Sequence, residues 1–239
     1  MLRTIIFFTF YPLVTVVSST LCILFGRSFA NKPADLSQRI WAKACLALAG
    51  IKVEADFSAL APGQTYVFMA NHQSNFDIPL LTACLDQWSV RMVAKDSLFK
   101  IPVFGWALRR VGHISIDRAK MRKAMQAIQE AVEIANSGIS IVIFPEGTRS
   151  RDFSQLQEFK AGGFILAIKT GLPVAPVVMS GSGEIMPKGH WFIRPGTVRI
   201  KALPPVAPGS YSLKEREQFK ENLQQAMSRA YLEMHRHGG

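Results

Sequence analysis

A long run without charge dominates the N-terminal end of the chain. The 23 residues of 4–26, between Arg3 and Arg27, are mostly apolar and include no charged side chain. As a helix this run measures about 35 Å, enough to cross or deeply enter a hydrocarbon core roughly 30 Å thick. The pattern therefore predicts a membrane segment. Pro12 lies in its middle and would kink a helix, so a bent hairpin that dips into the bilayer fits the pattern as well as a straight span does.

A cleaved signal peptide is the alternative explanation of this run. Residues 28–30, Ser-Phe-Ala, weakly resemble a cleavage site. Against it, the apolar run is longer than the roughly 7 to 15 residues of a signal core, and only Arg3 forms the charged leader. We therefore favour a retained membrane segment.

A second helical pattern follows the first. In residues 34–49 the apolar positions recur at mostly helical spacing, with basic residues between them. This pattern is typical of an amphipathic helix at a membrane interface, and Gly50 ends it. We expect residues 1–50 to form membrane-anchoring helices and residues 51–239 to form one α/β domain.

Beyond residue 50 the pattern changes to short apolar runs rich in β-branched residues. We predict strands over 66–70, 90–94, 113–116, 139–144, 173–178 and 197–202. Helical spacing separates them, most clearly over 119–136, and an amphipathic helix is predicted from Ser212 onwards. This alternation predicts an α/β fold: a mixed, largely parallel sheet flanked by helices and preceded by the N-terminal membrane-associated helical segment.

Composition and charge narrow the picture only in part. The chain has 239 residues, of which 49% are hydrophobic, and a formal net charge of +11. This length supports one sizeable core, and the charge attracts nucleic acid, an anionic lipid surface or a phosphorylated small molecule. The three cysteines, Cys22, Cys45 and Cys84, form no CxxC pair. Buried free thiols in a reducing compartment therefore fit better than zinc or disulfides.

A polar stretch between two apolar runs is the first candidate for chemistry. It holds His72 and Asp77, which on a regular helix would point about 140° apart. The two side chains can meet if His72 lies in a turn before a helix that Asp77 enters, with Ser74 and Asn75 as capping residues. A carboxylate on one imidazole nitrogen prepares the other as a general base. The alternative is a helix-capping loop with a solvated histidine.

A second polar stretch follows the predicted strand at 139–144. Directly after Pro145 come four residues of the types that bind anions, Glu146, Gly147, Thr148 and Arg149. Ligands of open α/β sheets bind beyond the carboxyl ends of strands, and arginine offers a planar fork suited to phosphate. The strand at 113–116 likewise ends in Asp117 and Arg118, so two arginines are predicted to converge on one anion. An ordinary loop with a surface ion pair is the alternative.

The chain resembles the glycerophospholipid acyltransferase family in four ordered blocks: 71–77 (NHQSNFD), 112–118 (GHISIDR), 144–150 (FPEGTRS) and 171–181 (GLPVAPVVMSG). The resemblance is specifically to the members that acylate 1-acyl-sn-glycerol-3-phosphate, and it covers about residues 50–205. Flanking stretches match at 93–112, 159–171 and 185–189. Ser115 departs from the pattern, because the second block usually has an apolar residue there, and this bears on the fit of the acceptor.

The resemblance implies an acyltransferase domain over residues 51–239. It would transfer an acyl group from acyl-CoA or acyl-ACP to the sn-2 hydroxyl of the acceptor, forming phosphatidic acid in phospholipid biosynthesis. His72 would be the general base and Asp77 its orienting partner, with no metal, no cofactor beyond the acyl donor and no acyl-enzyme. The residues that would bind the acceptor's glycerol phosphate are Arg118, Glu146, Gly147, Thr148, Arg149 and Lys95.

This interpretation also explains the membrane segment and the net positive charge of the chain. Lysophospholipid and product partition into the bilayer, whereas the anionic acyl carriers are cytosolic. We therefore expect an enzyme of the inner or cytoplasmic membrane whose catalytic domain faces the cytoplasm. The basic residues beside the apolar run agree with such a flank: Arg27, Lys32, Arg39 and Lys43.

Other function classes stay open with less support. A nucleic-acid-binding protein rests on charge alone, because the chain lacks an aromatic-basic binding motif. A serine hydrolase lacks GxSxG, since GSGE at 181–184 has the wrong frame. The same chemistry on another lysolipid, such as a lyso-ornithine lipid or a lysophospholipid in remodelling, and a non-catalytic lysolipid-binding protein are further alternatives. Four histidines are interpreted as loop or surface residues and not metal ligands: His113, His190, His235 and His237.

Overall fold

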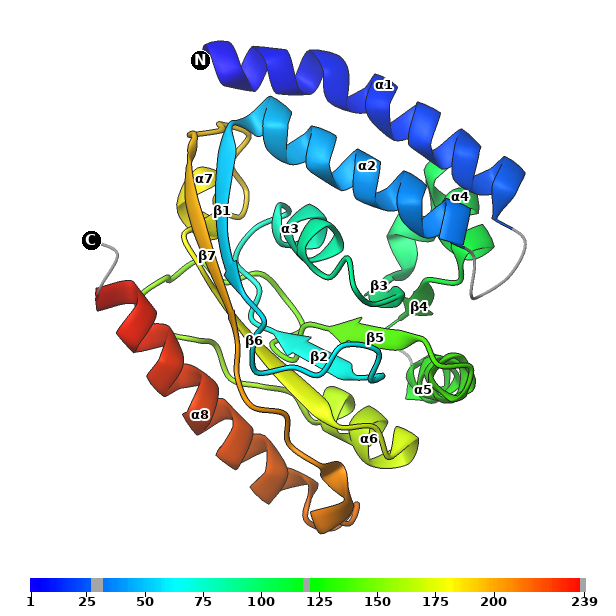
Figure 1. Ribbon diagram of the computed structural model, residues 1–239, viewed down its shortest axis with the longest axis vertical. Helices are drawn as coiled ribbons and strands as arrows, with labels where there is room; N and C mark the ends of the chain where they lie inside the picture. Colours follow the sequence, from blue (N-terminus) through cyan, green and yellow to red (C-terminus); the bar gives the residue numbers. More distant parts are fainter. Residues whose placement is uncertain (27–31, 118–120, 237–239) are drawn as a thin grey trace.

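Seven strands form one mixed sheet in the computed structural model, which describes residues 1–26, 32–117 and 121–236 (Figure 1). The strand order is β1-β7-β6-β2-β5-β3-β4, and every neighbouring pair is parallel except β6 and β7. The strands are β1 (Ile51–Asp56), β2 (Val67–Ala70), β3 (Val90–Lys95), β4 (Ile114–Ile116), β5 (Ser140–Ile143), β6 (Val174–Ser180) and β7 (Gly196–Ala202). The predicted fold class, a mixed and largely parallel sheet flanked by helices, is confirmed.

The central strands explain why the sequence pattern located them. Every residue of β2, β5 and β6 is buried, so their sequences are continuous apolar runs, as expected of parallel strands covered on both faces. The edge strand β1 was not among the predicted strands. Most of its residues are exposed, and its pairing with β7 along its whole length holds it in place.

Helices cover both faces of the sheet (Figure 1). One face carries α1 (Leu2–Phe25), α2 (Lys32–Ala49) and α3 (Asp77–Cys84), whose buried side chains share a core with β2, β6 and β7. The other face carries α5 (Met121–Asn136), α6 (Ala161–Thr170) and α8 (Arg216–Arg236) over a second core. The shorter elements are η1 (Asp96–Lys100), α4 (Phe104–Val111), α7 (Ser182–Ile185) and η2 (Pro208–Ser210).

The N-terminal helices form a hairpin that lies side by side on the sheet domain. The predicted bend at Pro12 is not where the hairpin turns, because α1 continues through Pro12 as one helix and α2 supplies the second arm. Within the described residues, α1 is the one helix long and apolar enough to cross a membrane, and 17% of its most apolar window is buried. Its large exposed apolar side chains are Leu2, Ile5, Phe10, Leu13, Val16, Val17, Leu21, Leu24 and Phe25.

The boundary proposed at residue 50 stays a prediction. Phe7 of α1 and Ala42 and Cys45 of α2 belong to the same buried cluster as the sheet residues, so the hairpin shares its core with the α/β domain. The three cysteines are free; Cys22 and Cys45 are buried as expected, whereas Cys84 is half-buried.

A buried polar network fastens α2 to β3. Arg91 is fully buried, and its guanidinium donates to the Asp35 carboxylate at 2.8 Å and to the Val111 carbonyl at 2.7 Å. Beside it, His113 accepts from the Met92 backbone N–H through Nδ1 at 3.0 Å, so its Nε2 carries the proton donated to Gln38 at 2.7 Å. Loss of solvation and the nearby Arg91 charge lower the pKa of His113 to about 3. His113 lies in the loop between α4 and β4, as interpreted, and there it is a half-buried, neutral structural residue whose two ring nitrogens both form hydrogen bonds.

We predict that Asp35→Ala lowers the free energy of unfolding by about 3 kcal/mol, because the buried Arg91 charge loses its 2.8 Å ion pair with the carboxylate. Urea unfolding in detergent micelles, followed by tryptophan fluorescence, measures the change. Glu54→Ala is the matched control, since Glu54 forms an exposed pair with Arg199 at 3.1 Å and such pairs contribute about 0–1 kcal/mol. Equal losses in the two variants would contradict the role given to the network.

Candidate active site

The loop between β2 and α3 is built around one buried carboxylate. Asp77, the first residue of α3, is fully buried, and its Oδ2 accepts hydrogen bonds from His72 Nδ1 at 2.7 Å and from two backbone N–H groups. Those N–H groups belong to Gln73 at 2.6 Å and Ser74 at 2.8 Å. The prediction that Ser74 and Asn75 cap the helix is wrong, because α3 has Phe76 at its N-cap position and no side-chain cap. The carboxylate instead folds the loop back over the helix N-terminus, where negative charge is favoured.

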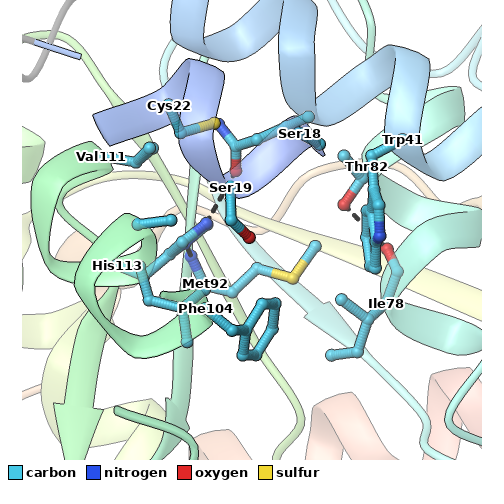
Figure 2. A pocket seen from close by; sticks show the side chains of 13 residues that line it. Ser18, Ser19, Cys22, Trp41, Ile78, Thr82, Met92, Phe104, Val111 and His113 are labelled. Atoms are coloured by element: carbon cyan, nitrogen blue, oxygen red, sulfur yellow. Dashed lines mark hydrogen bonds between the residues drawn. The ribbon is translucent and has the colours of Figure 1, made fainter. Parts of the chain in front are cut away.

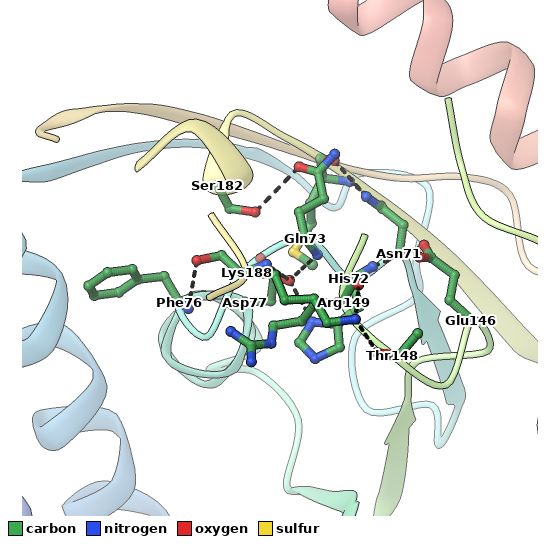
Figure 3. Close-up of polar contacts among 12 residues, drawn as sticks. Asn71, His72, Gln73, Phe76, Asp77, Glu146, Thr148, Arg149, Ser182 and Lys188 are labelled. Atoms are coloured by element: carbon green, nitrogen blue, oxygen red, sulfur yellow. Dashed lines mark hydrogen bonds and ion pairs between the residues drawn. The ribbon is translucent and has the colours of Figure 1, made fainter. Parts of the chain in front are cut away.

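The imidazole of His72 is held in one tautomer and one orientation. Because Asp77 is acceptor-only as a carboxylate, Nδ1 carries the proton and Nε2 keeps its lone pair. The ring stacks on Phe144 with 4.0 Å between centroids and 17° between planes. About a sixth of the side chain, 17%, stays exposed. A half-enclosed histidine with a fixed, free Nε2 has the arrangement of a general base (Figure 3).

Glu146 joins the ends of two strands. It is buried, and its Oε1 accepts from the His72 backbone N–H at 3.1 Å while its Oε2 accepts from Gln157 Nε2 at 2.7 Å. The Ser150 N–H donates back to the His72 carbonyl at 2.7 Å. Burial raises the pKa of Glu146 to about 7. These bonds fix the loop after β5 against the loop after β2.

Gly147 lets the chain turn sharply beyond β5. Its φ of +73° lies in the left-handed region, and its N–H closes the turn on the Phe144 carbonyl at 3.0 Å. The turn leaves Thr148 exposed and Arg149 half-buried. Lys188, from the segment between α7 and β7, donates through Nζ to Thr148 Oγ1 at 2.8 Å and to the Arg149 carbonyl at 3.0 Å (Figure 3).

The structure brings together four of the predicted acceptor-binding residues, Glu146, Gly147, Thr148 and Arg149. Lys95 ends β3, which is parallel to β2 and β5, so it lies at the same edge of the sheet; its side chain is exposed and no described contact joins it to the loop. Arg118 lies outside the described residues. The predicted convergence of Arg118 with Arg149 therefore stays a prediction.

Several residues that support the site have partners that no local pattern in the sequence indicates. The Asn71 side chain bonds both backbone groups of Met179 in β6, at 2.8 and 2.7 Å. Gln73 Nε2 donates to the Tyr231 hydroxyl at 2.7 Å, which connects the loop between β2 and α3 to α8. Ser182 is fully buried with its hydroxyl against Gln73 at 3.4 Å, so the serine considered for a hydrolase is not exposed to a substrate. Such contacts join residues up to 158 positions apart, beyond the reach of local patterns.

Two largely apolar cavities lie beside the hairpin. One, of about 200 Å³, lies against the loop between β2 and α3 at Asn75 and Phe76 and under Phe8 of α1. The other, the deeper cavity, of about 70 Å³, lies between α1, α2 and α4 and includes Ser19 and Met92 (Figure 2). Trp41 of α2 lines both cavities. Mostly apolar lining residues therefore extend from the loop between β2 and α3 along the hairpin.

Comparison with known proteins gives a consistent family of relatives. The family model described as Acyltransferase matches residues 52–180. A 1-acyl-sn-glycerol-3-phosphate acyltransferase of Salmonella typhimurium is 34% identical over 211 residues, covering 85% of this chain and 84% of that protein. The chloroplastic 1-acyl-sn-glycerol-3-phosphate acyltransferase BAT2 of Brassica napus is 40% identical over 135 residues, covering 56% of this chain and 38% of that protein.

A solved structure extends the similarity to nearly the whole chain. The crystal structure of the 1-acyl-sn-glycerophosphate acyltransferase PlsC from Thermotoga maritima matches with a TM-score of 0.82 and 27% identity, over 98% of this chain and 95% of that one. The chain spans 38% of the length of the Brassica napus relative. It spans 44% and 53% of the length of two further relatives, one algal and one from another plant.

We predict that Glu146 makes stability depend on pH. Because burial raises its pKa from the ordinary 4.5 to about 7, the fold favours the protonated carboxyl. That stabilisation is complete below pH 4.5 and is lost as pH rises through about 7. Wild-type protein should therefore lose stability relative to Glu146→Gln between these values, measured by urea unfolding at pH 5 and pH 8. A difference between the two proteins that does not change with pH would show that Glu146 ionises normally.

Proposed function

The chain belongs to the acyltransferase family, and on that premise we propose that it transfers an acyl group to the sn-2 hydroxyl of 1-acyl-sn-glycerol-3-phosphate, forming phosphatidic acid in phospholipid biosynthesis. The acyl donor is acyl-CoA or acyl-ACP. The observation that carries the proposal is the 2.7 Å contact between His72 Nδ1 and Asp77, which leaves Nε2 free at the carboxyl end of β2. The relatives, which are 1-acyl-sn-glycerol-3-phosphate acyltransferases, support the acceptor class.

The proposed chemistry uses His72 as general base. Nε2 takes the proton of the acceptor hydroxyl while the oxygen attacks the thioester carbonyl and a tetrahedral intermediate forms. The carbon–sulfur bond then breaks, and the thiolate leaves with the proton that the imidazolium returns. Asp77 stabilises the imidazolium through Nδ1, in the way that a buried carboxylate supports histidine in hydrolases. The acyl group passes directly between substrates, so no acyl-enzyme and no cofactor besides the donor is needed.

The loop after β5 is proposed to bind the acceptor's phosphate. Arg149 and Thr148 extend from the turn at Gly147 with polar groups available to a ligand, which supports direct contacts. Both oxygens of Glu146 already accept hydrogen bonds from the protein, which supports a positioning role for this residue. Lys95 and Arg118 remain proposed members of the same anion site.

The N-terminal hairpin is proposed to hold the site at the membrane, with the catalytic domain facing the cytoplasm where the acyl carriers are found. Phe7 of α1 packs on Phe76 of the catalytic loop with 5.3 Å between ring centroids, so the apolar helix directly adjoins the site. The exposed apolar side chains of α1 support insertion into lipid. Of the predicted cationic flank, Arg27 lies outside the described residues and Arg39 donates to the Trp88 carbonyl at 3.2 Å.

The two cavities along the hairpin are proposed to hold one acyl chain. Their apolar walls suit a hydrocarbon, and the cavity at Phe76 adjoins the loop that carries His72. The chain would pass Trp41 and end near Ser19 in the deeper cavity. The depth of that cavity would then limit the length of the chain that the enzyme accepts.

We predict that His72→Ala abolishes acyl transfer while the fold is kept, because the loop is also held by backbone bonds to Asp77. The assay uses purified protein in detergent, labelled acyl-CoA and four acceptors: 1-acyl-glycerol-3-phosphate, glycerol-3-phosphate, lysophosphatidylglycerol and lyso-ornithine lipid. Phosphatidic acid should form in the wild type, and turnover should fall at least about a hundredfold in the variant. His190→Ala, in an exposed loop, is the control and should keep wild-type turnover.

Two results would contradict the proposal. Turnover of the His72→Ala variant above about a hundredth of the wild-type value would exclude the general-base role. Preference for an acceptor without a phosphomonoester would keep the acyltransferase chemistry and overturn the acceptor, in favour of lysolipid remodelling or lyso-ornithine lipid acylation. Lysolipid binding without any acyl transfer would make the chain a non-catalytic lysolipid-binding protein.

We predict that Ser19→Leu shifts the preference toward shorter acyl chains, because leucine fills part of the deeper cavity. Ser19 is buried there and forms no described side-chain hydrogen bond, so the substitution removes no polar contact. Rates with acyl chains of increasing length, varied first in the donor and then in the acceptor, identify which chain uses the cavity. Val17→Leu, at an exposed position of α1, should leave the preference unchanged. A Ser19→Leu variant with an unchanged length profile would disprove the assignment.

A further inference from the structure

Lys188 is the cation that the described contacts place on the loop of Thr148 and Arg149. Its Nζ donates to Thr148 Oγ1 at 2.8 Å and to the Arg149 carbonyl at 3.0 Å. An ammonium has three hydrogens, so one remains after these two bonds. Lys188 is half-buried, and no carboxylate of the described residues forms an ion pair with it. Its positive charge is therefore held in place by neutral acceptors.

Other lysines of the chain are paired differently. Lys100 meets Asp96 at 2.7 Å, and Lys220 meets Glu217 at 2.6 Å, so their charges are neutralised locally. If Lys188 only joined two neutral oxygens, any hydrogen-bond donor would serve, and the uncharged amide of a glutamine could take its place. A fixed and uncompensated charge at this place instead favours an anion.

The contacts of Lys188 also prepare its two neighbours for the same ligand. Because Thr148 Oγ1 accepts from the ammonium, its own hydroxyl hydrogen is left to be donated outward. Because the Arg149 carbonyl is fixed, the backbone from which the guanidinium extends is fixed as well. No described contact engages the Arg149 guanidinium. The loop thus presents an ammonium, a hydroxyl and a guanidinium, a set of donors that matches the oxygens of a phosphomonoester.

The segment that carries Lys188 is anchored on both sides. Before it, the Met186 carbonyl accepts from Ser74 Oγ of the catalytic loop at 2.9 Å. After it, the Ile193 N–H donates to Thr4 Oγ1 of α1 at 3.1 Å, and Trp191 lies 5.7 Å from Phe8 between ring centroids. These contacts tie Lys188 to the catalytic loop and to the membrane-facing helix at once. The ammonium therefore has a defined place relative to His72.

We propose that Lys188 binds the phosphomonoester of the lysolipid acceptor and positions Thr148 and Arg149 for it. The inference rests on the proposed function, because it names a residue of the acceptor site of that reaction. Phosphate groups also occur on the acyl carriers. The location of Lys188 on the loop beyond β5, between the catalytic loop and the membrane-facing helix, favours the lipid headgroup as the occupant.

The experiment compares five variants in detergent micelles, each checked for its thermal unfolding midpoint. Lys188→Met and Lys188→Gln should each raise the KM for 1-acyl-glycerol-3-phosphate about 10- to 100-fold, as expected for a lost bond to a charged group. The kcat and the KM for acyl-CoA should stay within about threefold, because the contact is made in the ground state as well. Lys188→Arg should recover most of the loss, since it keeps the charge. Lys169→Met removes an exposed charge at the far end of α6 and should match the wild type.

Each other result overturns the inference. A Lys188→Gln variant with the wild-type KM for the acceptor would show that the lysine acts only as a hydrogen-bond donor within the protein and that its charge does not bind the acceptor. A rise confined to the KM for acyl-CoA would assign the charge to the donor. The rise in acceptor KM caused by Arg149→Ala gives the size of effect expected for a residue of the acceptor site. An equal fall in kcat for every acceptor in Lys188→Met would indicate a structural defect.

Failure of the proposed function is recognised separately. If the wild type forms no phosphatidic acid, binding of radiolabelled 1-acyl-glycerol-3-phosphate and of 1-acylglycerol is measured on wild type and Lys188→Gln by equilibrium dialysis in detergent. Loss of binding of the phosphorylated lipid alone in the variant would uphold the phosphate site without the catalysis. Equal binding by the two proteins would overturn it.

Discussion

The hydrogen bonding of one buried carboxylate oxygen organises the site. Asp77 Oδ2 accepts from His72 Nδ1 and from the N–H groups of Gln73 and Ser74, all within 2.8 Å. A buried charge is tolerated when such donors compensate it, and here the compensation comes from consecutive residues of one loop. The same bonds that make the burial of Asp77 possible therefore set the tautomer of His72. One loop conformation thus both compensates the buried carboxylate and orients the imidazole.

The parallel sheet supplies the second element of the site. Since β2 and β5 run in the same direction as neighbours, their carboxyl ends bring His72 and Glu146 together across 74 residues of sequence. Phe144 stacks on the imidazole, and the Ser150 backbone N–H donates to the His72 carbonyl. The imidazole proposed as general base and the loop proposed to bind phosphate are thereby held at a fixed separation, which a reaction between a hydroxyl and a thioester requires.

The hairpin of α1 and α2 is more than an anchor. Its inward side chains join the core of the sheet, Arg91 and Asp35 fasten it to β3, and its cavities begin beside Phe76. The exposed face of α1 stays apolar. A helix that is apolar on its outer side and packed on the catalytic loop on its inner side places the site where a lipid substrate is found.

The sequence by itself determined the fold class, the strands of the central sheet and the pair His72 and Asp77. Short-range sequence patterns carry this information, because buried parallel strands are continuous apolar runs and the pair lies within six consecutive residues. Only the tertiary structure decided the role of Glu146, the neutral state of His113, the contact of Gln73 with Tyr231 and the place of Lys188. Each depends on partners at least 21 residues away, which strand register and helix packing bring into contact and no local pattern encodes. The edge strand β1 belongs with them, since its polar sequence becomes a strand through pairing with β7.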